Sequence, residues 1–246
     1  MRSPARPIVM PPLGPALTTL WHLLFELSVT MPANWCLIGG QMVLLHGLDQ
    51  GRTDARPTVD GDVLVDVRAA STALRQVADF FVERSFEPDP GPDGNVHRFK
   101  RLFEKQFIVL DVLAPDNLGP RIDLTTRPPG RTLEAPGGTQ ALARVETIEV
   151  VAGGRIGEIP RPNLVGAIVM KASALNLPGG AERHVTDLAF LLSLLTDPVG
   201  ERLSLSGGEK RKLRRSGLLD RDGPGWRSLP VAQANAGYAA LRLLVS

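Results

Sequence analysis

The chain has a single cysteine, Cys36, among its 246 residues. One cysteine cannot form an intrachain disulfide, and a zinc site built from cysteines needs several, so both kinds of framework are excluded. This cysteine usage fits a reducing cytoplasm. No stretch approaches the roughly 20 consecutive apolar residues of a membrane span. We therefore expect a soluble, cytoplasmic protein without a membrane partner.

A strong net charge is also missing. Lysine and arginine nearly balance aspartate and glutamate, 28 against 26, which gives a formal net charge of +2. A charge this small does not by itself imply a nucleic-acid partner. The apolar fraction of 43% and the charged fraction of 22% are ordinary for a globular protein. Composition therefore leaves the function to be inferred from motifs.

The pattern of apolar residues divides the chain into three parts. Residues 1–15 are rich in proline, and we expect a flexible segment there. Over 16–160, helices are interspersed with short strands, and a hairpin-like pair late in the order indicates a mixed sheet. From 161 to 246 the pattern is helical. This order predicts an α+β protein, in which a lobe with a mixed β-sheet precedes a mainly helical C-terminal lobe. The expected helices are 16–29, 41–48, 72–84, 163–176, 181–196, 208–219 and 231–245, and the expected strands are 35–38, 62–67, 96–99, 107–113, 145–151 and 155–159.

Two carboxylates stand at the beginning of one expected strand, in Asp60-Gly61-Asp62. Residues two apart on a strand point to the same face, so Asp60 and Asp62 present their charges to one spot. Like charges that close repel unless a cation lies between them. Mg²⁺ prefers oxygen ligands and is often held by one or two carboxylates together with substrate phosphates. The pair predicts a Mg²⁺ site, with Mn²⁺ as an alternative ion, although D-x-D pairs are common in proteins.

A third carboxylate, Asp111, lies in the otherwise apolar run 107–113. A charge in a buried strand is costly unless it is paired or bound to a metal. If this strand lies beside that of Asp62, three carboxylates converge, as two-metal phosphoryl or nucleotidyl transfer requires. The alternative is that Asp111 caps the strand before a turn at 114–116.

Lys171 and Asp187 fall on the apolar faces of two expected helices. Lys171 shares its face with Ile168, and Asp187 shares its face with Leu191. Lysine and aspartate are seldom buried unless they are paired. The two residues therefore form either a purely structural ion pair or one wall of a cleft facing the carboxylates. In the second case Lys171 binds nucleotide phosphate, and Asp187 orients Lys171 or the nucleotide.

Other residues offer weaker signals. Gly39-Gly40 lets the backbone approach a phosphate at a helix N-terminus, although such a pair also occurs for plain geometry. The Thr58 hydroxyl can bind phosphate, although a threonine before a strand does not need such a role. Arg56 can face the γ-phosphate, although it can equally be a solvated loop residue. His184 is the only histidine beside a candidate catalytic residue, and most surface histidines have no such function.

A basic run over 209–215 holds five cations within six residues. Such a run can contact an RNA backbone, where affinity comes from neutralising phosphates. It is more often a solvated helix face.

The order of the motifs resembles the polymerase-β-like nucleotidyltransferase superfamily. Within it, the chain resembles the AbiEii-type nucleotidyltransferases, including the MenT-like toxins of type IV toxin–antitoxin systems. Lys171-Ala172 and the segment Arg183-His184-Val185-Thr186-Asp187-Leu188 are similar to that family's helical lysine and its R-x-x-x-D-L signature. The chain departs from the family in a longer interval before Asp60, with 49–56 as an inserted loop, and in Gly61, where an aliphatic residue is usual.

The resemblance implies a metal-dependent enzyme that moves an NMP from an NTP to an acceptor. Asp60, Asp62 and Asp111 are the implied metal ligands and catalytic carboxylates, Lys171 stabilises the leaving pyrophosphate, and Arg183 joins the nucleotide-binding residues. Some family members use a polynucleotide acceptor such as the 3′ end of tRNA, which implies an RNA substrate, a growth-arresting toxin activity and a cognate antitoxin protein. The alternatives are transfer to a small hydroxyl compound, as in antibiotic adenylyltransferases, and a non-catalytic nucleotide-binding module.

Overall fold

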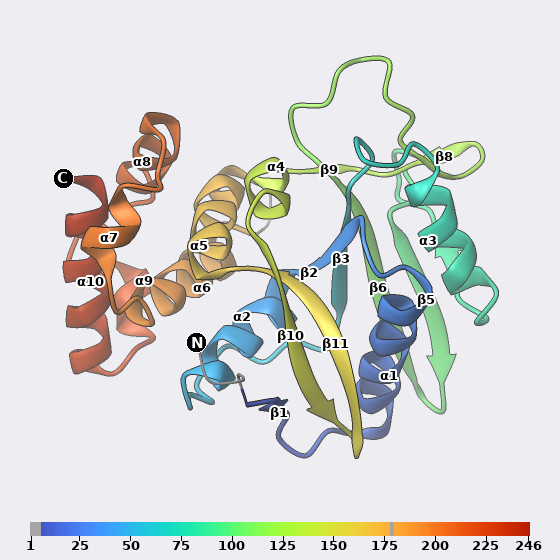
Figure 1. Ribbon diagram of the computed structural model, residues 1–246, viewed down its shortest axis with the longest axis horizontal. Helices are drawn as coiled ribbons and strands as arrows, with labels where there is room; N and C mark the ends of the chain where they lie inside the picture. Colours follow the sequence, from blue (N-terminus) through green and yellow to red (C-terminus); the bar gives the residue numbers. More distant parts are fainter. Residues whose placement is uncertain (1–5, 178–179) are drawn as a thin grey trace.

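The structure is a computed structural model that describes residues 6–177 and 180–246 (Figure 1). Its largest sheet has the strand order β2-β3-β6-β5-β4, with β9 paired to one end of β6. Neighbours β3 and β6 run parallel, whereas the pairs β2–β3, β6–β5 and β5–β4 are antiparallel. The mixed sheet and the α+β class predicted from the sequence are confirmed. The strands are β2 (Trp35–Ile38), β3 (Gly61–Val65), β4 (Glu87–Asp89), β5 (Arg98–Phe103), β6 (Gln106–Pro115) and β9 (Glu134–Ala135).

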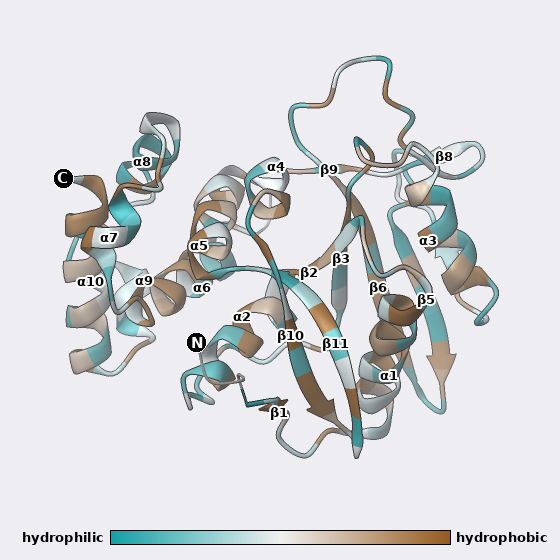
Figure 2. Cartoon of the chain, viewed as in Figure 1, coloured by the Kyte–Doolittle hydropathy of each residue, from teal (hydrophilic) through white to brown (hydrophobic). Residues whose placement is uncertain are grey.

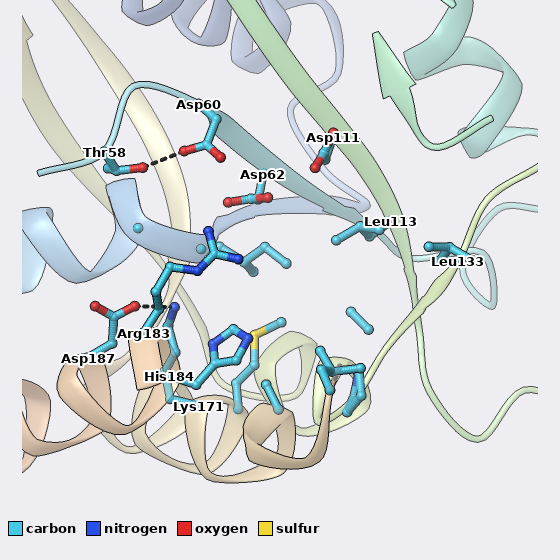
Figure 3. A pocket seen from close by; sticks show the side chains of 18 of the residues that line it. Thr58, Asp60, Asp62, Asp111, Leu113, Leu133, Lys171, Arg183, His184 and Asp187 are labelled. Atoms are coloured by element: carbon cyan, nitrogen blue, oxygen red, sulfur yellow. Dashed lines mark hydrogen bonds and ion pairs between the residues drawn. The ribbon is translucent and has the colours of Figure 1, made fainter. Parts of the chain in front are cut away.

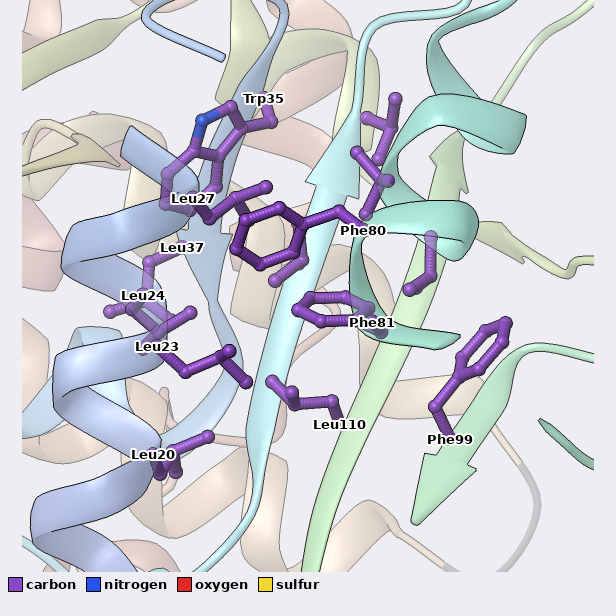
Figure 4. Packing of buried hydrophobic residues seen from close by; sticks show 14 of the residues in the cluster. Leu20, Leu23, Leu24, Leu27, Trp35, Leu37, Phe80, Phe81, Phe99 and Leu110 are labelled. Atoms are coloured by element: carbon purple, nitrogen blue, oxygen red, sulfur yellow. The ribbon is translucent and has the colours of Figure 1, made fainter. Parts of the chain in front are cut away.

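Both faces of the central strands are buried, which explains their continuous apolar sequence. On one face, Leu37 and Val63 pack in a cluster with helices α1 (Pro15–Thr30) and α3 (Ala73–Val82) (Figure 4). On the other face, Leu64 belongs to a smaller cluster that includes Met170. Successive side chains therefore enter different clusters, as the alternation of a strand requires. This double packing fixes the direction in which each strand residue points.

A second sheet contains β1 (Ile8–Val9), β10 (Val145–Ala152) and β11 (Arg155–Pro162). Strands β10 and β11 form the hairpin expected from the sequence, and β1 lies parallel to β10. Part of the segment that we expected to be flexible is thus a strand, and Met10 is buried directly after it. Residues 1–5 of that segment lie outside the described residues.

The chain after β11 is helical, as predicted. Helix α5 begins after Asn163, whose side chain accepts a hydrogen bond from the Gly166 backbone, and a 3₁₀ helix, Ala174–Asn176, follows it. Helix α8 ends at Arg214, earlier than expected, and Gly217 follows with a φ of 77°. Hydrophobic residues dominate α10 (Figure 2), which packs on α6. The helices are α5 (Leu164–Ser173), α6 (Ala181–Ser193), α7 (Pro198–Arg202), α8 (Gly207–Arg214), α9 (Pro224–Arg227) and α10 (Val231–Val245).

Helix α2 (Gly39–Asp49) joins the two parts of the molecule. Its Leu45 belongs to the cluster of the sheet, whereas Met42 and Val43 belong to the cluster of the C-terminal helices. Among residues 6–177 and 180–246, no helix is long and apolar enough to cross a membrane.

Candidate active site

A cavity of about 270 Å³ lies between the carboxylate-bearing parts of β3 and β6 on one side and helices α5 and α6 on the other (Figure 3). The structure brings every predicted site residue to this cavity, although these residues come from distant parts of the chain. Those residues are Gly39, Gly40, Arg56, Thr58, Asp60, Asp62, Asp111, Lys171, Arg183 and Asp187.

The register of the sheet explains why the carboxylates meet. Strand β3 lies between β2 and β6, and Asp62 is the register partner of Asp111 on β6. The adjacency that we expected for these two strands is observed. Strand β6 continues to Pro115, so Asp111 does not cap its end. Asp60 directly precedes β3 and accepts a hydrogen bond from the Thr58 hydroxyl.

The glycine pair leaves room for two side chains. Gly39 has a φ of 71°, and a Cβ atom added there would lie 1.7 Å from Asp62 Oδ2. A Cβ atom on Gly40 would lie 2.7 Å from the Thr58 hydroxyl oxygen. The start of α2 is therefore packed directly against Asp62 and Thr58, and no other residue type fits at these two positions without displacing them.

Crowding of like charges perturbs Asp62. Burial, followed by the charges of Asp111 and Asp60, raises the pKa of Asp62 to about 7, against an opposing effect of Lys171 and Arg98. Burial disfavours the ionised form of this carboxyl most, and the like charges beside it add to the effect.

Asp111 has a partner that the sequence did not reveal. Arg98 on β5 is its register partner, and the guanidinium donates from Nε to Oδ1 at 2.8 Å and from Nη2 to Oδ2 at 2.7 Å. Asp111 is buried, whereas the Arg98 side chain is partly exposed and lines the cavity. The signal in the sequence was the arginine on the neighbouring strand, but only the register of β5 against β6 shows that the two residues pair.

The carboxylates fit a divalent cation in part. Among the described residues, no three histidine, cysteine, aspartate or glutamate side chains are arranged to hold one metal ion. Asp60, Asp62 and Asp111 all line the cavity, and both oxygens of Asp111 accept hydrogen bonds from Arg98. Joint ligation of a metal ion by the three carboxylates stays a prediction. Asp60 and Asp62 offer a pair of hard oxygen donors, and a bound cation would favour the ionised form of Asp62.

The opposite wall of the cavity also carries cationic side chains. Lys171 Nζ donates to Asp187 Oδ2 at 2.8 Å, and Arg56 Nε lies 3.5 Å from Asp187 Oδ1. Lys171 and Asp187 are both buried, as their places on apolar helix faces predicted. The side chains of Lys171, Arg183 and His184 extend from α5 and α6 toward the carboxylates (Figure 3).

His184 lines the same wall. Burial, followed by the charge of Lys171, lowers its pKa to about 4, and Asp187 opposes the shift only in part. The imidazole is therefore neutral at pH 7. Within the part of the chain that the structure describes, its buried Nδ1 has no hydrogen-bond partner, and neither has the buried Nε of Arg56.

The remaining wall is apolar and was not predicted. Leu133 and Leu177 are 38% and 39% exposed, and both border the cavity together with Leu113 and Met170. Leu133 reaches this place because the segment that contains it continues into β9, which pairs with β6. A flat apolar ligand group has a matching surface here.

The basic run near the C-terminus is partly structural. Lys212 Nζ donates to the Ser173 hydroxyl at 2.9 Å, and Arg214 donates to the Val245 carbonyl. Arg211 and Arg215 are exposed. The run is thus a helix with one packed face and one solvated face.

Comparisons with known proteins support the fold. No protein-family model matches the sequence, and no curated protein does. The structure is similar to the crystal structure of an antigenic nucleotidyltransferase-like protein from Paracoccidioides brasiliensis, with a TM-score of 0.53 at 14% sequence identity. The similarity covers 92% of this chain and 95% of that chain. The protein therefore has a nucleotidyltransferase-like fold over that part of the chain, in agreement with the fold predicted from the motifs.

Proposed function

We propose that the protein transfers a nucleotidyl group from a nucleoside triphosphate to an acceptor hydroxyl. The observation that carries this proposal is the meeting of Asp60 and Asp62 with Lys171 across one cavity. A nucleoside triphosphate needs cations around its phosphates and an apolar surface for its base, and the cavity offers both. The nucleotidyltransferase-like fold supports the same reading.

Each residue has a defined role in this proposal. Asp60 and Asp62 would hold a Mg²⁺ ion, or Mn²⁺ as the alternative, which would supply charge neutralisation at the phosphates. Lys171 binds a phosphate oxygen and offsets the charge that develops as pyrophosphate leaves. Asp187 keeps the Lys171 ammonium in place through their hydrogen bond. Arg56 and Arg183 add positive charge for the β- and γ-phosphates.

The acceptor that we propose is RNA such as tRNA. The exposed Arg211 and Arg215 of the basic run can neutralise phosphates of a polynucleotide. A toxin activity, with a cognate antitoxin protein as partner, is the finer form of this proposal and rests on the AbiEii-type and MenT-like motifs of the sequence.

The test is a label-transfer assay. The purified protein is incubated with Mg²⁺, total tRNA and each α-³²P-labelled nucleoside triphosphate in turn, and the products are separated on a denaturing gel. We expect label on RNA with wild-type protein and none with D60A, and circular dichroism verifies that D60A is folded. Label on RNA that persists in D60A would contradict the site assignment. Nucleotide binding without transfer to RNA would move the acceptor to a protein or a small hydroxyl compound.

A further inference from the structure

Three charged residues form one row across adjacent strands. Asp62 on β3 is in register with Asp111 on β6, which in turn is in register with Arg98 on β5. Along the edge of the cavity, two neighbouring carboxylates, those of Asp62 and Asp111, are therefore followed by the guanidinium of Arg98. The positions follow from backbone pairing, so the neighbourhood of Arg98 and Asp111 does not depend on a mobile loop.

Arg98 satisfies both oxygens of Asp111. The two hydrogen bonds, 2.8 and 2.7 Å long, join Nε and Nη2 to different carboxylate oxygens. A bidentate pair of this kind is among the strongest hydrogen-bonded arrangements between side chains. Asp111 is only 8% exposed, so little of it is left for another ligand.

A second divalent cation at Asp111 would meet two obstacles. It would have to break both hydrogen bonds from Arg98, and it would then lie beside a guanidinium of the same sign. Asp60 instead accepts a hydrogen bond from the neutral hydroxyl of Thr58, and no ion pair to Asp60 is present among residues 6–177 and 180–246. Asp60 is therefore free to bind a divalent metal ion, whereas Asp111 is already neutralised by the guanidinium of Arg98.

We propose that Arg98 is a built-in cation that takes the place of a second metal ion, so that the site binds one divalent ion, at Asp60 and Asp62. This inference rests on the proposed function and makes it more specific. Two N–H donors face Asp111, and the guanidinium has five, so the Nη1 group remains available to a phosphate oxygen of the substrate. Asp111 is then a positioning residue that holds Arg98 in the cavity wall.

The experiment counts bound metal ions without using activity. Mn²⁺ is titrated into the full-length protein at pH 8, and free Mn²⁺ is measured by electron paramagnetic resonance. We expect one ion per chain in wild-type protein and in D111N. R98M and R98Q remove the hydrogen bonds to Asp111 and leave no positive charge in place of the guanidinium. We expect two bound Mn²⁺ ions per chain in each of these variants. R98K, which keeps the charge, should return the count to one, and the double variant R98M/D111N should also bind one.

R101M is the matched control. Arg101 lies on the same strand, and its guanidinium donates to the Arg84 carbonyl at 3.0 Å instead of facing the cavity. R101M should bind one Mn²⁺ ion per chain, as wild-type protein does. Two ions in wild-type protein, or one ion in both R98M and R98Q, would overturn the role of Arg98 while leaving nucleotidyl transfer intact. No bound ion in wild-type protein would contradict the metal site of the proposed function itself.

Discussion

At Gly39, the addition of a single Cβ atom should disturb the nucleotide site. Its φ of 71° is strained for any other residue, and an added Cβ would lie 1.7 Å from the Asp62 carboxylate. Gly51 has the same φ of 71° but has open space around its Cβ position, so G51A is a matched control for backbone strain. We expect both variants to lose about 1–2 kcal/mol of stability from that strain. Only G39A should also lose nucleotide binding, as measured by calorimetry. Equal nucleotide affinities in the two variants would show that Asp62 is not constrained by this contact.

Asp62 should make the stability of the ligand-free protein depend on pH. Its pKa is about 7 in the folded state, well above the ordinary value near 4 in an unfolded chain. Between these values the folded state holds a proton that the unfolded state releases, so stability falls as pH rises through this window and then levels off. D62N removes the charge. At pH 8 its free energy of unfolding should exceed that of wild type by about 1–2 kcal/mol after allowance for solvent screening, so its melting temperature should be higher. The difference should vanish near pH 4. Equal melting temperatures at pH 8 would contradict the raised pKa of Asp62.

Substitutions can separate a structural role of the buried Lys171–Asp187 ion pair from a role in nucleotide binding. Removing one partner leaves an uncompensated buried charge, so D187A should lose about 3–5 kcal/mol of stability. Replacing both with apolar residues, in K171M/D187L, should restore most of that loss. We expect the double variant to fold and to bind no nucleoside triphosphate. Wild-type nucleotide affinity in this variant would show that the pair is a structural ion pair alone.

At the scale of single elements, the N-terminal strand gives a clear test. Ile8 is 6% exposed and its neighbour Val9 is 66% exposed, because β1 presents alternate residues to the core and to solvent. I8S should lose roughly 2–3 kcal/mol through lost apolar burial, whereas V9S should change stability by less than about 0.5 kcal/mol. Thermal denaturation of the two variants measures this. Equal, small effects would favour the flexible segment that the proline content suggested.

The elements that the sequence predicted well are those with strong local signals. Strands β2, β3 and β6 are apolar on both faces, and helix α5 has an asparagine N-cap, so their patterns hold without knowledge of the rest of the fold. Strand β1 was missed because only its pairing with β10 orders that proline-rich stretch. Strand β9 was missed because it has two residues and exists through its pairing with β6.

The same distinction holds within the site. Asp60, Asp62 and Asp111 could be recognised because charges are unusual at the ends and in the middle of apolar strands, and Lys171 because it lies on an apolar helix face. Arg98 could not, because an arginine on a half-exposed strand is ordinary until the register places it opposite Asp111. The apolar wall with Leu133 depends on a long connection whose path no local pattern specifies.

At the scale of the whole molecule, the cavity lies beside the smaller hydrophobic cluster, because Ile38, Ala135 and Met170 of that cluster line it. One wall belongs to the strands of the sheet and the other to α5 and α6, and α2 contributes residues to both larger clusters. A ligand that contacts both walls should stabilise the folded protein as a unit. The boundary that we predicted near residue 160 remains a prediction, and the helical region begins with α5 at Leu164.

The most direct test of the central claim is calorimetric titration of the ligand-free protein with each of the four common ribonucleoside triphosphates and Mg²⁺ at pH 8. We expect one nucleoside triphosphate per chain, with binding lost in D62N and in K171M/D187L and kept in G51A. The first two variants remove groups that face the ligand, and the third changes a glycine away from the cavity. Wild-type protein that binds no nucleoside triphosphate, or D62N that binds as tightly as wild type, would contradict the assignment of this cavity as a nucleotide site.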